Sequence, residues 1–520
     1  MSHATESQGR IALAEDAPKV NLEALILENH GLEIHDHPIM GRTIIATRDM
    51  DESLLYQPIL RELPALVCKQ QDYMDFMEQF LDSPVELQVG LLDMFYQPLD
   101  SKMGKDLIEP AKVLFVLGIL EDFTVIHQLL SILMTNGHQY KGDHTAIPLF
   151  GSKFSHSCAP NVGYASLASE DGALEYKLLC PVKKGELVSF SYLSDLLETP
   201  TFERRKLLME TKSFRCSCSR CNGPDYCRCM SCPTCSERVP CQYLDESDDV
   251  FWECRNCGKL EGEAFTATER QLSATLVVVN RKIELQTDFD SIDAECSPTM
   301  LQELVKECQT DLSETHYLTM KALRLLFTSV TARAYVQIKK MMLRGLPITT
   351  PPILSLFRQS VVAGLHLVLA GECVAAECTG CQSAAIPAET KDACLHLQIK
   401  HTPNYDRALV VQHICDNLFR LPVCWWPPLA LTMALRYLPV MKARFGLKVA
   451  HIEARINRVM KASLVCIACG TYWDSYTGET SPRPPPSADK EENGQQPTVP
   501  NGKDKVTNKK KSNKKKNRRK

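Results

Sequence analysis

The chain has 520 residues, which is too many for one ordinary hydrophobic core and predicts two to four domains. Hydrophobic residues make up 44% and charged residues 23%, a balance that excludes collagen-like, fully disordered and miniature disulfide-stabilised proteins. The net charge of −4 conceals a basic segment at residues 501–520, where nine Lys, two Arg and one Asp give +10, so the first 500 residues carry −4 − 10 = −14.

The N-terminal third predicts strands followed by helices. Residues 21–60 alternate like short strands, and residues 41–49 are interpreted as a turn together with the strand, rich in β-branched residues, that it enters. Residues 61–138 place apolar side chains three and four positions apart, which predicts a helical block. Within it we expect one long helix over residues 108–134, with Pro110 in its first turn.

Strand signals return after this block. Residues 146–192 read as strands, with an Asp-Gly pair at 171–172 and a Lys-Gly pair at 184–185 as hairpin turns. The next helix is predicted to use Thr199 as its N-cap and Pro200 as its first residue. A helical block inside a strand-rich region indicates an insertion in a β domain and not a simple alternating α/β sheet.

The remaining chain is predicted to be helical from about residue 266 to residue 472, which indicates a separate all-α domain. The fold class is therefore α+β. The predicted divisions are a flexible N-terminus, the strand-rich domain with its insertion, a metal-binding region, the helical domain and a disordered linker with a basic tail, at residues 1–20, 21–200, 201–262, 263–475 and 476–520.

The location of the protein is expected to be intracellular, in the cytoplasm, the nucleus or both. The N-terminus lacks the basic start and apolar stretch of a signal peptide, and no apolar run approaches the roughly 20 residues that span a bilayer. We therefore expect no membrane partner. The lysine-rich run at residues 509–520 suits a nuclear import signal, a contact with nucleic acid or another polyanion, or a solubilising tail.

The 23 cysteines are the main chemical signal, because ten of them fall within the 42 residues 216–257. In a reducing compartment, paired cysteines two residues apart usually bind metal, and thiolates are the ligands that tetrahedral zinc prefers. Two such pairs with a short β-like stretch between them predict a zinc ribbon made by Cys232, Cys235, Cys254 and Cys257.

A second group, Cys216, Cys218 and Cys221, provides only three ligands, and spacing alone does not identify the fourth. Possible competitors are Cys227, Cys229 and Cys241. Two further cysteine pairs are Cys378 with Cys381 and Cys466 with Cys469. They could together form a third metal site, but we interpret them as packing or loop thiols, because free cysteine is commonly a small buried hydrophobe.

Five motifs in chain order carry a family resemblance. They read GRTIIATRD, TNGH, LFGSKFSHSCAPN, GELVSFSY and FRCSCSRC. Together they resemble the split SET domain of the SET and MYND-domain family of protein-lysine methyltransferases over roughly residues 25–260. The segment DLSETHYLTMKALRLL resembles the start of that family's C-terminal, TPR-like helical domain. The resemblance implies a methyltransferase that uses S-adenosylmethionine, about two zinc ions and a lysine of a histone or non-histone protein as substrate.

The resemblance also assigns roles to individual residues. It implies that Tyr192 is the catalytic tyrosine that orients the substrate amine, and that the fourth zinc ligand beside Cys216, Cys218 and Cys221 is Cys158. The residues implied to contact the cofactor are Arg42, Asn136, Ser155, His156 and Phe214. Read singly, Asn136, His156 and Phe214 would pass as a capped turn and two core side chains, and their order along the chain favours the functional interpretation.

Three features depart from the family pattern. Thr43 stands where the family has the second glycine of an early loop, and Ser155 stands where it has an asparagine. The MYND finger is missing, since Cys68 is the only cysteine between Asp49 and Lys153. The alternative to a methyltransferase is therefore a catalytically impaired zinc-binding scaffold that binds a protein through its helical domain. A ribbon that binds nucleic acid is disfavoured, because the ribbon is acidic between its cysteine pairs.

Overall fold

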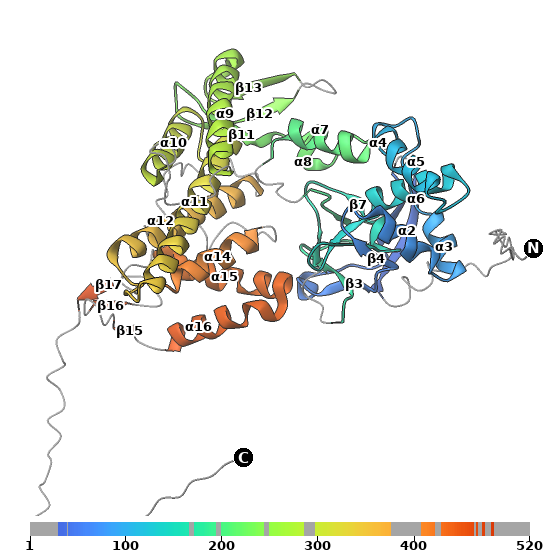
Figure 1. The fold of residues 1–520 in the computed structure, drawn as a ribbon. Helices are drawn as coiled ribbons and strands as arrows, with labels where there is room; N and C mark the ends of the chain where they lie inside the picture. The colour runs from blue at the N-terminus through green and yellow to red at the C-terminus, as the bar shows by residue number, and fades with distance from the viewer. Residues whose placement is uncertain are drawn as a thin grey trace, which may run out of the picture.

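The structure is a computed structural model, and it forms a strand-rich part, a cysteine-rich link and a helical part (Figure 1). Helices and strands are mixed, which agrees with the predicted α+β class. The strand-rich part is drawn in blue to teal in Figure 1, and the helical part in yellow to red. The residues that the structure describes are 30–38, 40–165, 171–193, 199–243, 249–284, 297–375, 407–421, 428–461, 464–465, 471–473 and 480–482.

The strand-rich part consists of short paired strands instead of one large sheet. β1 (Leu32–His37) pairs antiparallel with β2 (Gly41–Ala46), the strand predicted after the turn. Gly41 begins β2 with φ of 68°, a left-handed conformation that glycine adopts without strain. Two three-stranded sheets have the orders β3-β9-β8 and β4-β6-β5, with strands at Pro58–Glu62, Leu174–Leu178, Val162–Ala165, Leu66–Lys69, His144–Ile147 and His138–Tyr140.

The helical insertion starts later than predicted, because residues 66–69 form strand β4, which pairs with β6. The predicted long helix over residues 108–134 is also wrong. It is divided where Gly118 adopts φ of 72° and where the side chain of Asp122 caps a new helix by accepting a hydrogen bond from Thr124 N at 2.7 Å. The helices of the insertion, α2 to α6, are Tyr73–Leu81, Val85–Leu92, Lys102–Asp106, Ile108–Val116 and Phe123–Asn136.

The link begins with α7 (Thr201–Lys212) and α8 (Ser219–Asn222). The predicted helix start is wrong by one residue, since Pro200 is the N-cap. Proline has no side-chain acceptor, and Asp225 Oδ2 accepts the hydrogen bond from Thr201 N at 2.7 Å. A four-stranded antiparallel sheet in the order β11-β12-β13-β14 follows, with strands at Asp225–Ser231, Arg238–Tyr243, Val250–Cys254 and Gly258–Leu260.

The helical part packs around the largest hydrophobic core of the described residues, and this core also includes Trp252 and Cys241 of the four-stranded sheet. The link and the helices are therefore one packed unit. The helices are α9 (Gly262–Glu284), α10 (Pro298–Asp311), α11 (Tyr317–Leu343), α12 (Pro351–Ala375), α14 (Ala408–Leu418), α15 (Pro428–Phe445) and α16 (Ala450–Lys461).

Helix α12 corrects one expectation from the sequence. Its segment Pro351–Gly371 is long and apolar enough to cross a membrane, although no such segment was expected. Polar residues such as Arg358 and Ser360 interrupt the apolar run and hide its length in the sequence. In the structure 67% of the apolar window is buried, and α12 packs between α11 and α14. Burial of this kind is typical of the core helix of a protein that does not enter a membrane.

Past the helices, a small sheet pairs β15 (Leu464–Val465), β16 (Thr471–Trp473) and β17 (Thr480–Pro482). The third of these strands lies inside the segment predicted to be disordered. The two C-terminal CxxC pairs, the basic run and the flexible N-terminus of the sequence analysis lie outside the described residues.

The strand-rich part and the helical part contact each other directly. The buried Lys177 of β9 donates from Nζ to Ala443 O of α15 at 2.6 Å and lies 3.0 Å from Glu175 Oε2. A second contact places Tyr56 and Leu179 of the strand-rich part against the core of the helices. These contacts set α15 beside the strands.

A buried ion pair with a histidine beside it ties the four-stranded sheet to the helices. The guanidinium of Arg228, on β11, donates to both oxygens of Glu269 on α9, at 2.9 and 2.6 Å. His316 Nε2 lies 3.2 Å from Glu269 Oε1, and all three residues are buried. Burial opposes ionisation of this carboxyl, but the hydrogen bonds from His316 and Arg228 outweigh it and hold the pKa of Glu269 at about 2.

We expect Glu269→Leu to lower the free energy of unfolding by about 3 kcal/mol or more, because it leaves the Arg228 guanidinium buried without a counter-charge. Adding Arg228→Met should recover most of this loss, measured by urea unfolding. Glu263→Gln, an exposed change on the same helix, is the control. The pKa of Glu269 lies below its ordinary value, so its contribution should be complete above about pH 4.5 and decline as the pH falls towards 2.

Candidate functional site

The motifs FSHSCAPN and SFSY meet through a parallel strand pair. β7 (Ser155–His156) lies alongside β10 (Ser189–Phe190), and Ser157 N donates to Phe190 O at 3.1 Å. Asn161 fastens the two segments, because its amide accepts from Ser189 N and donates to Leu187 O, both at 2.8 Å. Residues more than 30 positions apart in the sequence are therefore held at one place.

The buried imidazole of His156 connects this strand pair to a cysteine cluster. Its Nδ1 accepts a hydrogen bond from Tyr192 N at 3.0 Å, so the proton of the neutral ring is on Nε2. Nε2 lies 3.2 Å from the sulfur of Cys158 and points its proton there. Burial lowers the pKa of His156 to about 4, which keeps the ring neutral at physiological pH.

Tyr192 lies at the centre of an aromatic cluster. Its ring centroid is 5.1 Å from those of His156 and Phe190 and 6.3 Å from that of Phe214. The hydroxyl donates to Phe154 O at 2.7 Å. Burial raises the pKa of Tyr192, so the phenol stays protonated and acts as a hydrogen-bond donor.

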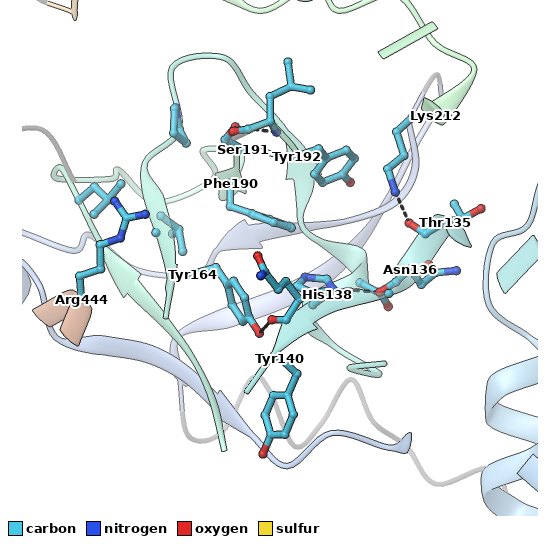
Figure 2. Close-up of a pocket in the computed structure, with 18 of the residues that line it drawn as sticks. Thr135, Asn136, His138, Tyr140, Tyr164, Phe190, Ser191, Tyr192, Lys212 and Arg444 are labelled. Carbon is cyan, nitrogen blue, oxygen red and sulfur yellow. Dashed lines mark hydrogen bonds between the residues drawn. The ribbon is translucent and has the colours of Figure 1, made fainter. Parts of the chain in front are cut away.

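A cavity of about 550 Å³ opens beside Tyr192 (Figure 2). Its wall combines the end of α6, strands β5, β8 and β10, the end of α7 and residues of α14 and α15. Segments from all parts of the fold are needed to close it. The aromatic, charged or amide side chains of its wall include Asn136, His138, Tyr140, Tyr164, Phe190, Tyr192, Lys212, Arg444 and Phe445.

The first group of cysteines comes together as the resemblance implied. The sulfurs of Cys158, Cys216, Cys218 and Cys221 all lie within 4.8 Å of one another, with 3.5 Å between Cys221 and Cys158 and 4.0 Å between Cys158 and Cys216. A tetrahedral zinc with four thiolates at about 2.3 Å requires sulfurs about 3.8 Å apart. Arg204 of α7 donates to Cys221 Sγ at 3.5 Å, which suits a cluster of thiolates.

The second group comprises Cys232, Cys235, Cys254 and Cys257, the four residues of the predicted ribbon. Their sulfurs also lie within 4.8 Å of one another, with 3.5 Å between Cys235 and Cys254. The competitors Cys227, Cys229 and Cys241 lie buried on β11 and β12 and belong to neither group. Both groups of thiols therefore have the donor set and the spacing that zinc requires.

The remaining predicted cofactor residues take different positions. Asn136 lines the cavity at the end of α6, and its amide donates to Phe95 O at 2.8 Å and Ile132 O at 3.0 Å. Arg42 is not among the residues of the cavity wall, and its guanidinium pairs with Asp93 Oδ2 at 2.6 Å. Phe214 lies against Tyr192 and His156, beside the cavity.

The two residues that depart from the family pattern contact each other. Thr43 Oγ1 and Ser155 Oγ are 2.5 Å apart and buried, so one hydroxyl donates to the other. Thr43 has no positive φ, whereas Gly41 has one, so a side chain at position 43 is accommodated without backbone strain. The pair joins β2 to β7 directly.

Of the residues in the cavity wall, only Asn136 and Tyr192 were predicted from the sequence. His138 and Lys212 are two that were not. His138 ends the motif TNGH and Lys212 precedes Phe214 by two positions, so their place in or beside the motifs was the available signal. His138 Nδ1 donates to Asn136 O at 2.9 Å, and Nε2 has no hydrogen-bond partner among the described residues. Burial lowers the pKa of His138 to about 4, so Nε2 is a bare acceptor.

Comparison with known proteins gives two partial matches, and no protein-family model matches the chain. A SET and MYND domain-containing protein of Dictyostelium discoideum is 38% identical over 80 residues, which cover 15% of this chain and 18% of that protein. A putative SET domain-containing protein of Acanthamoeba polyphaga mimivirus is 32% identical over 92 residues, 18% of this chain and 34% of that protein. This chain is a relative of SET-domain proteins.

The relationship confirms the resemblance that the motifs indicated, at the level of the SET family. The matched stretches span 18% and 34% of the two relatives. The similarity to SET-domain proteins therefore covers a minor part of each chain.

We expect the Thr43 and Ser155 hydroxyls to be energetically coupled. Thr43→Val and Ser155→Ala should each lower the free energy of unfolding by about 1–3 kcal/mol, because each substitution leaves the other buried hydroxyl without its hydrogen-bond partner. The double variant should lose about 1 kcal/mol less than the sum, measured by urea unfolding. As a control, the loss of stability from Thr275→Val, an exposed change on α9, should simply add to that from Ser155→Ala. If the losses from Thr43→Val and Ser155→Ala also simply add, the hydrogen bond between the two hydroxyls contributes nothing to stability.

Proposed function

We propose that this SET-domain relative is an S-adenosylmethionine-dependent protein-lysine N-methyltransferase, with a histone or non-histone protein as its substrate. The observation that carries the proposal is the cavity beside Tyr192. It places a half-buried, protonated phenol in a wall of aromatic rings, and this phenol also packs against the first cysteine group. This is the combination that the SET resemblance implies.

The chemistry requires positioning and exclusion of water. When bound, S-adenosylmethionine supplies a methyl group activated by its sulfonium. The protein must then hold an amine in line with that methyl group and keep water away. Phe190 and Tyr164 give the cavity an apolar wall for an alkyl chain, and a half-buried phenol such as Tyr192, with its raised pKa, can orient an amine without titrating at neutral pH.

The cofactor residues are proposed from the motifs and from this geometry. His156 and Phe214 lie against Tyr192, and Asn136 lies in the cavity wall. Ser155 and Arg42 belong to the same proposed set, although the Ser155 hydroxyl is engaged by Thr43 and the Arg42 guanidinium by Asp93. The unpaired Nε2 of His138 offers a bound ligand a hydrogen-bond acceptor.

Zinc is proposed for both cysteine groups. Four thiols within 4.8 Å of one another match a closed structural site in each case, and thiolate ligands favour zinc. In the first group, Cys158 comes from the strand-rich part and the other three come from the link. A zinc ion there would pin the link against the segment that carries His156.

The alternative function is a catalytically impaired scaffold that binds a protein partner through its helical domain. One observation favours it: Lys212 and Arg444 put positive charge in the wall of the cavity that a substrate lysine would enter. Location in the cytoplasm, the nucleus or both, and any contact of the basic tail with nucleic acid, belong to the same proposal as expectations from the sequence.

We expect the protein to bind S-adenosylmethionine in calorimetry and to transfer radiolabelled methyl groups to one or more proteins of a cellular panel. Tyr192→Phe should reduce transfer by about 100-fold or more while cofactor binding changes little, because the hydroxyl orients the amine and not the cofactor. Tyr335→Phe, a matched change on α11, should leave both unchanged. Cofactor binding without transfer to any protein supports the scaffold instead, and full activity of Tyr192→Phe overturns the assignment of that residue.

Metal analysis of the purified protein should find about two zinc ions per chain. Cys158→Ser should reduce the content to about one and lower the melting temperature, because one of four ligands is lost. Cys180→Ser, at an exposed cysteine outside both groups, and Cys227→Ser should retain two. Two ions in Cys158→Ser would contradict its role as the fourth ligand.

A further inference from the structure

The cavity beside Tyr192 has an unusual charge balance for a site that would receive a lysine. Among the described residues of its wall, the side chains that carry charge are Lys212 and Arg444, and none is Asp or Glu. In Figure 2 these two residues lie on opposite sides of the cavity. The described part of the wall therefore offers a substrate ammonium no carboxylate with which to pair.

Lys212 is the cation next to Tyr192. Its Nζ lies 5.6 Å from the centroid of the Tyr192 ring and donates to Thr135 O at 2.8 Å and Met134 O at 3.3 Å (Figure 2). Those carbonyls belong to the last turn of α6, where the helix dipole favours a positive charge. The ammonium is thus held in place by two carbonyl oxygens and an aromatic face.

The groups that face Lys212 carry little charge. His138 is neutral, since burial lowers its pKa to about 4, and Tyr192 is neutral because burial raises its pKa. On α7, Glu210 lies 3.6 Å from Lys102 of α4 and pairs with it at the surface. Burial also lowers the pKa of Lys212, to about 8, so it is mostly charged at neutral pH.

We propose that Lys212 is a positioning residue that favours the neutral form of the incoming substrate amine, by holding the one positive charge that this end of the cavity accommodates. The inference rests on the methyltransferase function proposed above. Two amines would then lie side by side, that of Lys212 and that of the substrate. Lys212 has carbonyl and aromatic partners for its charge, whereas a charged substrate amine would face neutral rings and a like charge. The pKa of the substrate amine is therefore lowered, and a larger share of the bound substrate has lost its proton.

The neutral amine is the form that methyl transfer needs. Its nitrogen lone pair forms the new bond to carbon while the bond from that carbon to the cofactor sulfur breaks, leaving S-adenosylhomocysteine. The product is a methylammonium, which then releases one proton to water. A like charge nearby shifts the pKa of an amine downwards by about one to three units, so Lys212 favours the reactive form at neutral pH.

The test uses the full chain and two probes with the same four-carbon side chain, the acetylated methylamides of lysine and of norleucine. Norleucine has the alkyl chain without the amine. At pH 7, the wild type should bind the lysine probe more weakly than the norleucine probe, measured by calorimetry or ligand-observed NMR. In Lys212→Met this discrimination should shrink by about tenfold or more, while Lys212→Arg should retain it. In the wild type the discrimination should also shrink at pH 10, where Lys212 is neutral and a larger share of the free lysine probe is neutral too.

The kinetic arm uses the protein labelled in the methylation panel. In Lys212→Met the acidic limb of kcat should move to higher pH by about one unit or more and KM should fall, because the bound amine then keeps its proton. Lys212→Arg should keep the wild-type limb. Lys206→Met, an exposed change on the same helix, should alter neither constant.

The possible outcomes are distinct. Equal discrimination between the two probes in wild type, Lys212→Met and Lys212→Arg overturns the inference, whatever the activity of the protein. Methyl transfer with the same pH limb in wild type and Lys212→Met also overturns it and leaves the proposed function intact. Absence of transfer to any protein overturns the proposed function, and the binding arm then decides the role of Lys212 by itself.

Discussion

The hydrogen bonds of His156 are the constraint on which the rest of the site depends. One ring nitrogen accepts from the main chain of Tyr192, and the other points its proton at the sulfur of Cys158. Because the ring is buried and neutral, each nitrogen has one fixed role. The position of the Tyr192 backbone and the position of the cysteine cluster are consequently coupled through a single side chain. A metal in the cluster would hold the sulfur and, through it, the ring and the phenol.

This coupling explains why so many distant segments converge. The parallel pair β7 and β10 brings His156 beside Tyr192, and α7 then carries both Lys212 to the cavity and Arg204 to the cysteines. Helix α15 closes the opposite side of the cavity, where the contact from Lys177 to Ala443 holds it. The strand-rich part provides the phenol, the link provides three thiols and the helical part provides a wall, so no part contains the whole cavity alone.

The sequence predicts the parts of this arrangement that depend on local spacing. The ribbon cysteines follow from their pairing, and the turn before β2 follows from Gly41. The fourth member of the first cysteine group does not, because Cys158 lies 58 positions before Cys216 and only the family resemblance connects them. The division of the predicted long helix depends on one left-handed glycine, and apolar periodicity continues across it. The contact between Thr43 and Ser155 spans 112 positions and was invisible to any local pattern. Lys212 was missed because a lysine in the last turn of a helix is ordinary.

The Thr43 and Ser155 pair and Lys212 bear on the choice between enzyme and scaffold in different ways. The two hydroxyls hydrogen-bond to each other inside the protein. The cofactor contact that the resemblance implies for Ser155 is thereby replaced by a structural one, and the enzyme interpretation is weakened only by the loss of that contact. Lys212 is different, because it places a charge inside the cavity at the cost of burial. A cation there would repel a substrate ammonium, yet the chemistry uses the neutral amine. The same charge that argues against binding a protonated lysine therefore argues for selecting its reactive form, and affinity alone cannot be used to judge activity in this cavity.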